Sequence, residues 1–226
     1  MLRAYFLEVT GVKKLSVKKM VLLAMLAAVA YIMVFFIRIP VVLFLSYEPK
    51  DVIITIGGFL LGPMASFVIS LLVSLVEMVS ISQTGPIGCL MNLLSTCSFA
   101  CTAAFIYKRR HTLKGAILGL VAGSVVMVCA MLLWNWLITP LYMGLERSVV
   151  EALLIPAFLP FNLLKAGFNS ALTLALYKPL AGALRRTGLL ETKSGSPGAS
   201  RIGLYLFAFG LLATCIILLL VLRGIL

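Results

Sequence analysis

Two amides and one ammonium fall on a single face of a predicted helix in the last third of the chain. Asn162, Lys165 and Asn169 are spaced i, i+3 and i+7 within an apolar stretch, so they share one helical face. Pro160 frees a backbone carbonyl close by, which adds hydrogen-bonding capacity. Polar groups at membrane depth are costly and usually line a cavity or pair with each other. The stripe predicts a small-molecule site built on Asn162 and Lys165. Asn169 either joins it or bonds a neighbouring helix.

Two more polar residues lie within apolar stretches, and the sequence allows two interpretations of each. Asn135 lies between Trp134 and Trp136, which indicates either an interfacial aromatic belt or a pocket with stacking faces and one amide. Glu77 could pair with Lys165 or lie near the outer headgroups.

The sequence holds no recognisable catalytic or metal-binding set. It has no P-loop, no Ser/His/Asp set and no His-x-x-x-His pair, so we predict no enzyme, no catalytic residue and no metal site. Cys97 and Cys101 are four residues apart, but no His or carboxylate accompanies them, which favours packing over metal binding.

The elements that position these residues must lie in a membrane. Apolar residues make up 62% of the 226 residues and charged residues 12%, more apolar surface than one soluble core of this size could hide. A membrane-spanning helix needs about 20 apolar residues. We predict an all-α, polytopic membrane helical bundle with six spans and a seventh C-terminal one. The spans are 17–36, 52–61, 64–82, 87–107, 115–139 (stopped by Pro140), 152–184 (interrupted by Pro156 and Pro160) and 202–222.

The net charge of +12 follows the topology. Basic residues cluster at the predicted helix ends, which is the positive-inside pattern. This places the N-terminus and the loop 108–114 in the cytoplasm and the loops 37–51, 82–87 and 140–151 outside. Anionic lipids are the expected partner of the basic residues, and nucleic acid is not. The chain divides into a cytoplasmic stretch 1–15, a six-helix membrane domain 16–188, a linker 189–201 and an additional transmembrane helix 202–223.

Five segments resemble the substrate-binding S components of energy-coupling factor (ECF) transporters, most closely the riboflavin-specific members. In order along the chain they are AMLAAVA at 24–30, KDVIITIGGFLLGP at 50–63, TGPIGCLMN at 84–92, WNWLITPLYMG at 134–144 and LPFNLLK at 159–165. The resemblance covers about residues 16–188, and the predicted seventh span departs from the family's six-helix pattern.

The resemblance implies a protein of the cell membrane that captures a vitamin from outside. It would deliver the vitamin to a membrane-embedded coupling subunit driven by two cytoplasmic ATPases. The alanine motif of the first span would face that coupling subunit, which carries over to Ala24 and Ala28. The loop after that span would cap the ligand, which carries over to Tyr47, Glu48 and Asp51. Polar residues of the fifth and sixth spans would hold the ligand, which carries over to Asn135, Asn162 and Lys165.

The chemistry of these residues suits riboflavin, which is the transported ligand and not a cofactor. An Asn matches the imide edge of the flavin ring, and a Lys can donate to a ring carbonyl. Aromatic side chains can enclose the ring. Carboxylates such as Glu48 or Asp51 can accept hydrogen bonds from the hydroxyl tail. Two alternatives stay open: an S component for another vitamin or small precursor, and a stand-alone secondary transporter with Glu77 or Lys165 at a coupling-ion site.

Overall fold

The computed structural model describes residues 17–43, 45–82, 84–186 and 201–222, and nearly all of them are helical. The predicted cytoplasmic stretch 1–15 and most of the predicted linker 189–201 lie outside these residues. The elements in chain order are α2 (Val17–Phe36), β1 (Ile39–Val42), β2 (Leu45–Tyr47), α3 (Lys50–Leu61), α4 (Pro63–Ser80), α5 (Gly85–Arg109), α6 (Leu113–Met143), α7 (Arg147–Leu153), the π-helix η1 (Leu154–Phe158), α8 (Leu159–Arg186) and α9 (Arg201–Leu222).

Five helical stretches in the described part of the chain are long and apolar enough to cross a membrane. They are α2, α4, α5, α6 and the continuous stretch from Arg147 to Leu184. The outer surface carries many exposed large apolar side chains, such as Phe36, Val79 and Leu141, as lipid contact requires. The chain is therefore a multi-pass membrane protein. The predicted count of six spans plus one is not confirmed, because α3 has only 12 residues and rises about 18 Å.

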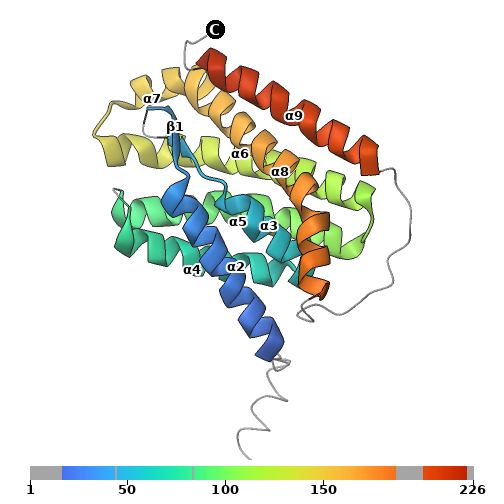
Figure 1. The fold of residues 1–226 in the computed structure, drawn as a ribbon. Coiled ribbons are helices and arrows are strands. Elements are labelled where there is room, and N and C mark those ends of the chain that lie inside the picture. Colours follow the sequence, from blue (N-terminus) through green and yellow to red (C-terminus); the bar gives the residue numbers. More distant parts are fainter. Residues whose placement is uncertain (1–16, 44, 83, 187–200, 223–226) are drawn as a thin grey trace, which may run out of the picture.

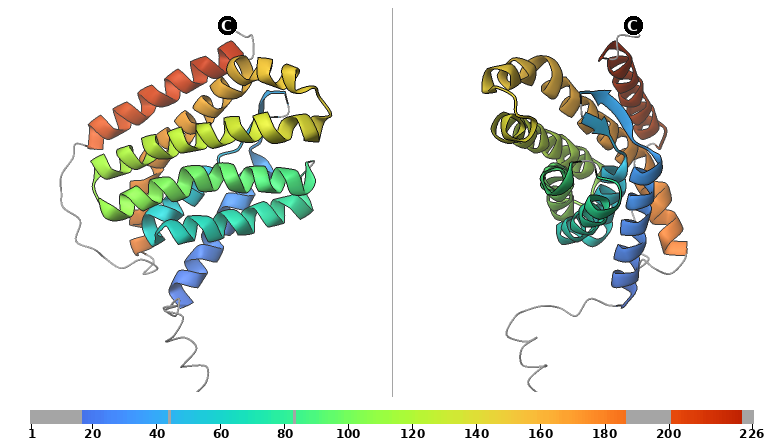
Figure 2. Two further views of the ribbon diagram at one scale, coloured as in Figure 1. Left: turned by 180° about the vertical axis from the view of Figure 1, so that it is seen from behind. Right: turned by 90° about the vertical axis from the view of Figure 1, so that its left-hand side faces the viewer.

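The long helices form a layered bundle with α3 at its centre (Figure 1). Helices α4, α5 and α6 lie side by side, and α2 and α8 cross this layer. Helix α9 runs along the outer side of α8 (Figure 2). A β-carbon at Gly167 of α8 would come within 2.5 Å of the Cys215 Sγ of α9. A side chain at position 167 would therefore displace the Cys215 side chain or move the two helices apart.

The segment after α2 is a β-hairpin, and not the irregular loop that the sequence predicts. Strands β1 and β2 pair antiparallel, with Ile39 opposite Tyr47 and Pro40 opposite Ser46. The β-branched residues Ile39, Val41 and Val42 favour extended backbone, and Pro40 is tolerated because a two-stranded sheet has only edge strands. The all-α fold class holds for nearly all of the described residues, and this short hairpin is its exception.

Two predicted helix ends were also wrong. Helix α6 passes through Pro140 and ends at Gly144, whose φ of 64° gives a left-handed cap. Pro140 lacks the N–H that would bond the carbonyl four residues earlier, but this single loss does not end the helix, whereas Gly144 supplies its left-handed cap. The predicted sixth span begins earlier, at Arg147, and it absorbs Pro156 in the wide turn η1 instead of breaking there.

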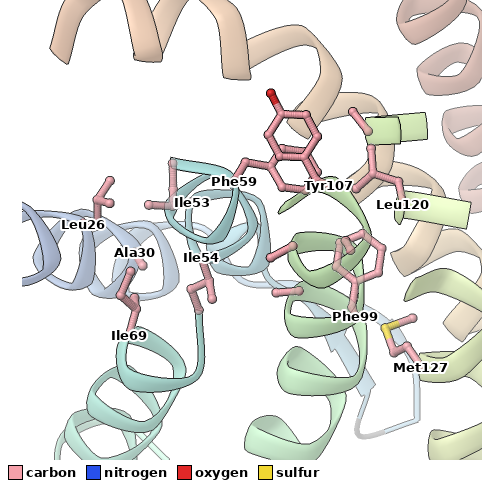
Figure 3. Packing of buried hydrophobic residues seen from close by; sticks show 14 of the residues in the cluster. Leu26, Ala30, Ile53, Ile54, Phe59, Ile69, Phe99, Tyr107, Leu120 and Met127 are labelled. Atoms are coloured by element: carbon pink, nitrogen blue, oxygen red, sulfur yellow. The ribbon is translucent and has the colours of Figure 1, made fainter. Parts of the chain in front are cut away.

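The apolar core joins the central helices (Figure 3). Leu26 and Ala30 of α2 face Ile53 of α3 and Ile69 of α4, while Phe99 of α5 lies near Met127 of α6. At another part of the core, the Phe59 ring stacks on Tyr107 with their centroids 4.4 Å apart. This packing fixes the positions of α3, α5 and α8, which carry the polar residues of the site.

Candidate functional site

A buried ion pair joins Lys165 of α8 to Asp51 of α3. The Lys165 Nζ lies 3.1 Å from Asp51 Oδ2 and donates to the Ser95 Oγ of α5 at 3.2 Å. Asp51 is completely buried and Lys165 is 5% exposed. A buried ammonium requires a partner, and for Lys165 this partner is Asp51, a residue of α3 that lies 114 positions earlier in the chain.

Asn169 links this pair to the hairpin. Its Nδ2 donates to Asp51 Oδ2 at 3.2 Å, and its Oδ1 accepts from the Tyr47 hydroxyl at 3.2 Å. The Tyr47 ring also lies 5.0 Å from the Phe168 ring. Burial raises the pKa of Tyr47, as does the charge of Asp51, so this phenol stays a neutral donor at physiological pH. Hydrogen bonds thus connect the hairpin to Asp51.

Four charged side chains form a second cluster at the base of the hairpin. Arg38, which precedes β1, contacts Glu48 Oε1 at 2.7 Å and Glu77 Oε1 at 2.9 Å. Lys50, at the start of α3, contacts Glu48 Oε2 at 2.6 Å and Glu77 Oε2 at 2.5 Å. The half-buried Asn92 of α5 donates to Glu77 Oε1. The cluster ties both ends of the hairpin to α3 and α4 with two positive and two negative charges.

The charge state of Glu48 is set by this cluster. Burial alone would raise the pKa of this carboxyl, but the nearby Lys50, Lys165 and Arg38 outweigh burial and lower it from 4.5 to about 2. Glu48 is thus an anion at physiological pH. Glu77 does not pair with Lys165, which was one of its two predicted positions. It pairs with Arg38 and Lys50, and Lys165 pairs with Asp51.

Asn135 and Asn162 are buried but hydrogen-bonded within their own helices. The Asn135 Nδ2 donates to the Met131 carbonyl at 2.7 Å, and its Oδ1 accepts from Thr139. The Asn162 Nδ2 donates to the Phe158 carbonyl at 2.7 Å, at the end of the π-turn. The structure therefore brings Tyr47, Glu48, Asp51, Lys165 and Asn169 together at the base of the hairpin, and it leaves these two amides as separate groups on neighbouring helices.

The two tryptophans beside Asn135 have different surroundings. Trp134 lines a small, mainly apolar hollow between α5 and α6, together with Thr139 and Tyr142. Trp136 donates to Glu151 at 2.9 Å, and the Arg147 guanidinium lies over its ring. Asn135 itself is not among the residues that line this hollow, so both interpretations of the Trp134–Trp136 segment stay predictions.

The arrangement suits binding better than chemistry. Each of Arg38, Lys50 and Lys165 is ion-paired, and both Asp51 oxygens accept hydrogen bonds. In the parts of the chain described, no group of three or more His, Cys, Asp or Glu side chains could hold a metal ion. What remains is a buried, charge-balanced set of donors and acceptors beneath a hairpin.

Sequence reasoning missed several members of the site. Arg38 and Lys50 were assigned only to helix ends and loops, and Asn92, Ser95 and Thr96 were not singled out. The available signal was charge balance, because Asp51, Glu77 and Lys165 at membrane depth demand partners. Ala24 and Ala28 lie on an exposed face of α2, and their partner-facing role stays a prediction.

The bundle of apolar helices and the buried polar site define an integral membrane protein that binds a small ligand. The model of the family described as "ECF transporter, substrate-specific component" matches residues 18–177. The chain belongs to this family, which confirms the resemblance seen in its motifs and makes it a transporter's binding subunit and not an enzyme. Helix α9 lies beyond the matched residues.

Individual relatives agree with the family. The riboflavin transporter RibU of Staphylococcus aureus is 28% identical over 189 residues, which are 78% of this chain and 98% of the relative. The riboflavin transporter FmnP of Bacillus subtilis is 26% identical over 164 residues, covering 67% and 85%. A solved structure titled "Structure and mechanism of the S component of a bacterial ECF transporter" matches with a TM-score of 0.63 and 29% identity, covering 75% of this chain and 98% of that one.

Proposed function

We propose that the chain captures riboflavin at the outer face of the cell membrane and delivers it to a coupling subunit driven by two ATPases. The observation that carries the proposal is the buried Lys165, whose ammonium is held beneath the hairpin beside Asp51 and Ser95. The names of the relatives RibU and FmnP support riboflavin as the ligand, and family membership supports the coupling module and its ATPases as partners.

Each group of the site matches a part of the flavin. In the described chain Lys165 donates to Ser95 and is ion-paired with Asp51, so at least one of its three N–H donors is left for a ring carbonyl. Asn162 offers a donor and an acceptor to the imide edge, and Asn135 is a second such amide. Aromatic side chains enclose the ring, while Tyr47 and Glu48 of the hairpin region cover the hydroxyl tail.

The charges of the site favour the free vitamin over its phosphorylated form. The three cations Arg38, Lys50 and Lys165 are already balanced by Glu48, Glu77 and Asp51. A phosphate dianion would enter this neutral region without a cation of its own, and burying an uncompensated charge is costly. We therefore expect riboflavin to bind more tightly than flavin mononucleotide in a competition titration.

The proposed topology has six crossings, with α3 as a short one, a cytoplasmic N-terminus and the hairpin outside. Residues 16–188 form the binding unit, 189–201 the linker, and α9 a seventh crossing that packs on α8. The small residues Ala24 and Ala28 of α2 form the face that contacts the coupling subunit, because small side chains let helices approach closely.

Titration of the purified protein with riboflavin, followed by flavin fluorescence quenching, tests the site. Asn162→Ala and Lys165→Ala should each weaken binding by about tenfold or more, because each removes a buried hydrogen bond to the ligand. The control Ser124→Ala removes a hydroxyl that bonds the Leu120 carbonyl within α6 and lies 3.5 Å from the Ser170 hydroxyl of α8; Ser124 is not among the proposed ligand contacts, so this variant should change little. Unchanged affinity in both site variants would contradict the assignment.

A further inference from the structure

The Asp51 carboxylate collects three donors from two other helices. Its Oδ1 accepts from the Thr96 Oγ1 of α5 at 2.7 Å, and its Oδ2 accepts from Asn169 at 3.2 Å and faces the Lys165 Nζ at 3.1 Å, both of α8. The residue itself stands in the first turn of α3 and is completely buried. An ionised carboxylate accepts only and has about four lone-pair sites, so little capacity remains for a ligand.

We propose that Asp51 is a positioning residue for ligand binding: it fixes the Lys165 ammonium so that the remaining N–H donor points at the ligand, and does not contact the ligand itself. The inference rests on the proposed function and refines it. A lysine has a long, flexible stem, and without fixed partners its ammonium samples many positions. Asp51 and Ser95, from two different helices, hold it in one.

The same carboxylate connects Lys165 to the hairpin. Tyr47 of β2 donates to Asn169, and Asn169 donates to Asp51, so a chain of hydrogen bonds runs from the hairpin to the ammonium. Asparagine at position 51 would break this arrangement, because its amide would turn an NH₂ group toward at least one of the three donors. It would also remove the negative charge that balances Lys165.

A double-mutant cycle on riboflavin binding tests the proposal. Asp51→Asn should weaken binding by about 10- to 100-fold, the effect of losing one well-placed charge-assisted hydrogen bond. Lys165→Met should weaken binding at least as much. If Asp51 acts through Lys165, the double variant should bind within about threefold of Lys165→Met alone, because the two residues then act as one unit.

Difference infrared spectra of bound riboflavin add a second measurement, the stretching frequency of the flavin ring carbonyls. A general loss of packing in the protein would not shift this frequency. A hydrogen bond from Lys165 lowers a carbonyl frequency, and Asp51→Asn should return it toward that of free riboflavin. The matched control is Thr55→Val, one turn along α3, whose hydroxyl bonds the Asp51 backbone carbonyl and not the carboxylate. It should leave affinity within about twofold and the carbonyl bands unchanged.

The outcomes separate the inference from the proposed function. Native protein that does not bind riboflavin overturns the proposed function and the inference with it. If the native protein binds riboflavin and Asp51→Asn binds it with equal affinity, the inference alone is overturned. The inference is also overturned if the losses of affinity from the two single variants multiply in the double variant. If Asp51→Asn alone does not fold, the double variant can still be measured, because it buries neither charge of the pair. Its riboflavin affinity is then compared with that of Lys165→Met, and the two should agree within about threefold.

Discussion

The four-charge cluster of Arg38, Glu48, Lys50 and Glu77 allows a quantitative test of the fold at the base of the hairpin. Lys50 is 1% exposed and contacts both carboxylates. Replacing it with methionine keeps the apolar stem but leaves two carboxylates facing one guanidinium. Removing one partner of a buried ion pair costs about 3–5 kcal/mol. Because the remaining Arg38 side chain is 35% exposed and still offsets one carboxylate, we expect the lower end, about 3 kcal/mol.

This cost should be visible as a lower melting temperature. At roughly 2–4 °C per kcal/mol for a protein of this size, Lys50→Met should melt about 6–12 °C below the native protein. The double variant Lys50→Met/Glu77→Gln restores neutrality, with Arg38 paired to Glu48, and should recover at least half of the loss. Thermal unfolding in detergent can be followed with a thiol-reactive dye in a Cys129→Ser background, because Cys129 is exposed whereas Cys89 and Cys215 are buried.

Replacement of the exposed Lys178 by methionine is the matched control and should leave the melting temperature unchanged. The reasoning fails if Lys50→Met melts within about 2 °C of the native protein. It fails equally if the neutral double variant is no more stable than the single variant.

Three further predictions concern other parts of the molecule. Gly167→Leu should push α9 from α8, destabilise the fold by about 1–3 kcal/mol and speed maleimide labelling of the buried Cys215; an unchanged labelling rate would contradict this packing. Because the pKa of Glu48 is lowered from 4.5 to about 2, its stabilising effect is complete above pH 4.5 and disappears toward pH 2. The melting temperatures of native protein and Glu48→Gln should therefore converge over that interval, and parallel curves would be inconsistent with it. Ala24→Trp should abolish uptake in cells but leave riboflavin binding by the purified protein intact, whereas Val125→Trp on the exposed face of α6 should impair neither; loss of binding in Ala24→Trp would argue against a partner-facing role.

The helices could be predicted from hydropathy because lipid contact imposes a long apolar run on each of them. Helix α2 has the predicted bounds. The hairpin could not be predicted in this way, because Ile39, Val41 and Val42 lie in a sequence so rich in apolar residues that a short strand does not stand out. The proline-based predictions failed for a related reason: whether Pro140 ends α6 depends on its distance from the true stop at Gly144.

From chemistry alone, the site could be predicted only at the residues whose cost in a membrane is plain, whereas Tyr47, Glu48 and Asp51 were predicted from the family resemblance. Lys165 and Asn169 stood out because a charge and an amide recur at helical spacing. The choice of Asp51 over Glu77 as the partner of Lys165 depends on how α3, α4 and α8 pack, which no local pattern records. Lys50 was missed because a lysine at the start of an apolar segment is the usual mark of a helix end at the headgroups.

The central claim, that this membrane protein is built to bind riboflavin, is tested most directly by one absorbance spectrum. The protein should be purified in detergent from cells grown in rich medium and scanned across the flavin bands. The account predicts a yellow protein that releases free riboflavin on denaturation. A colourless protein that also fails to quench the fluorescence of added riboflavin would contradict it.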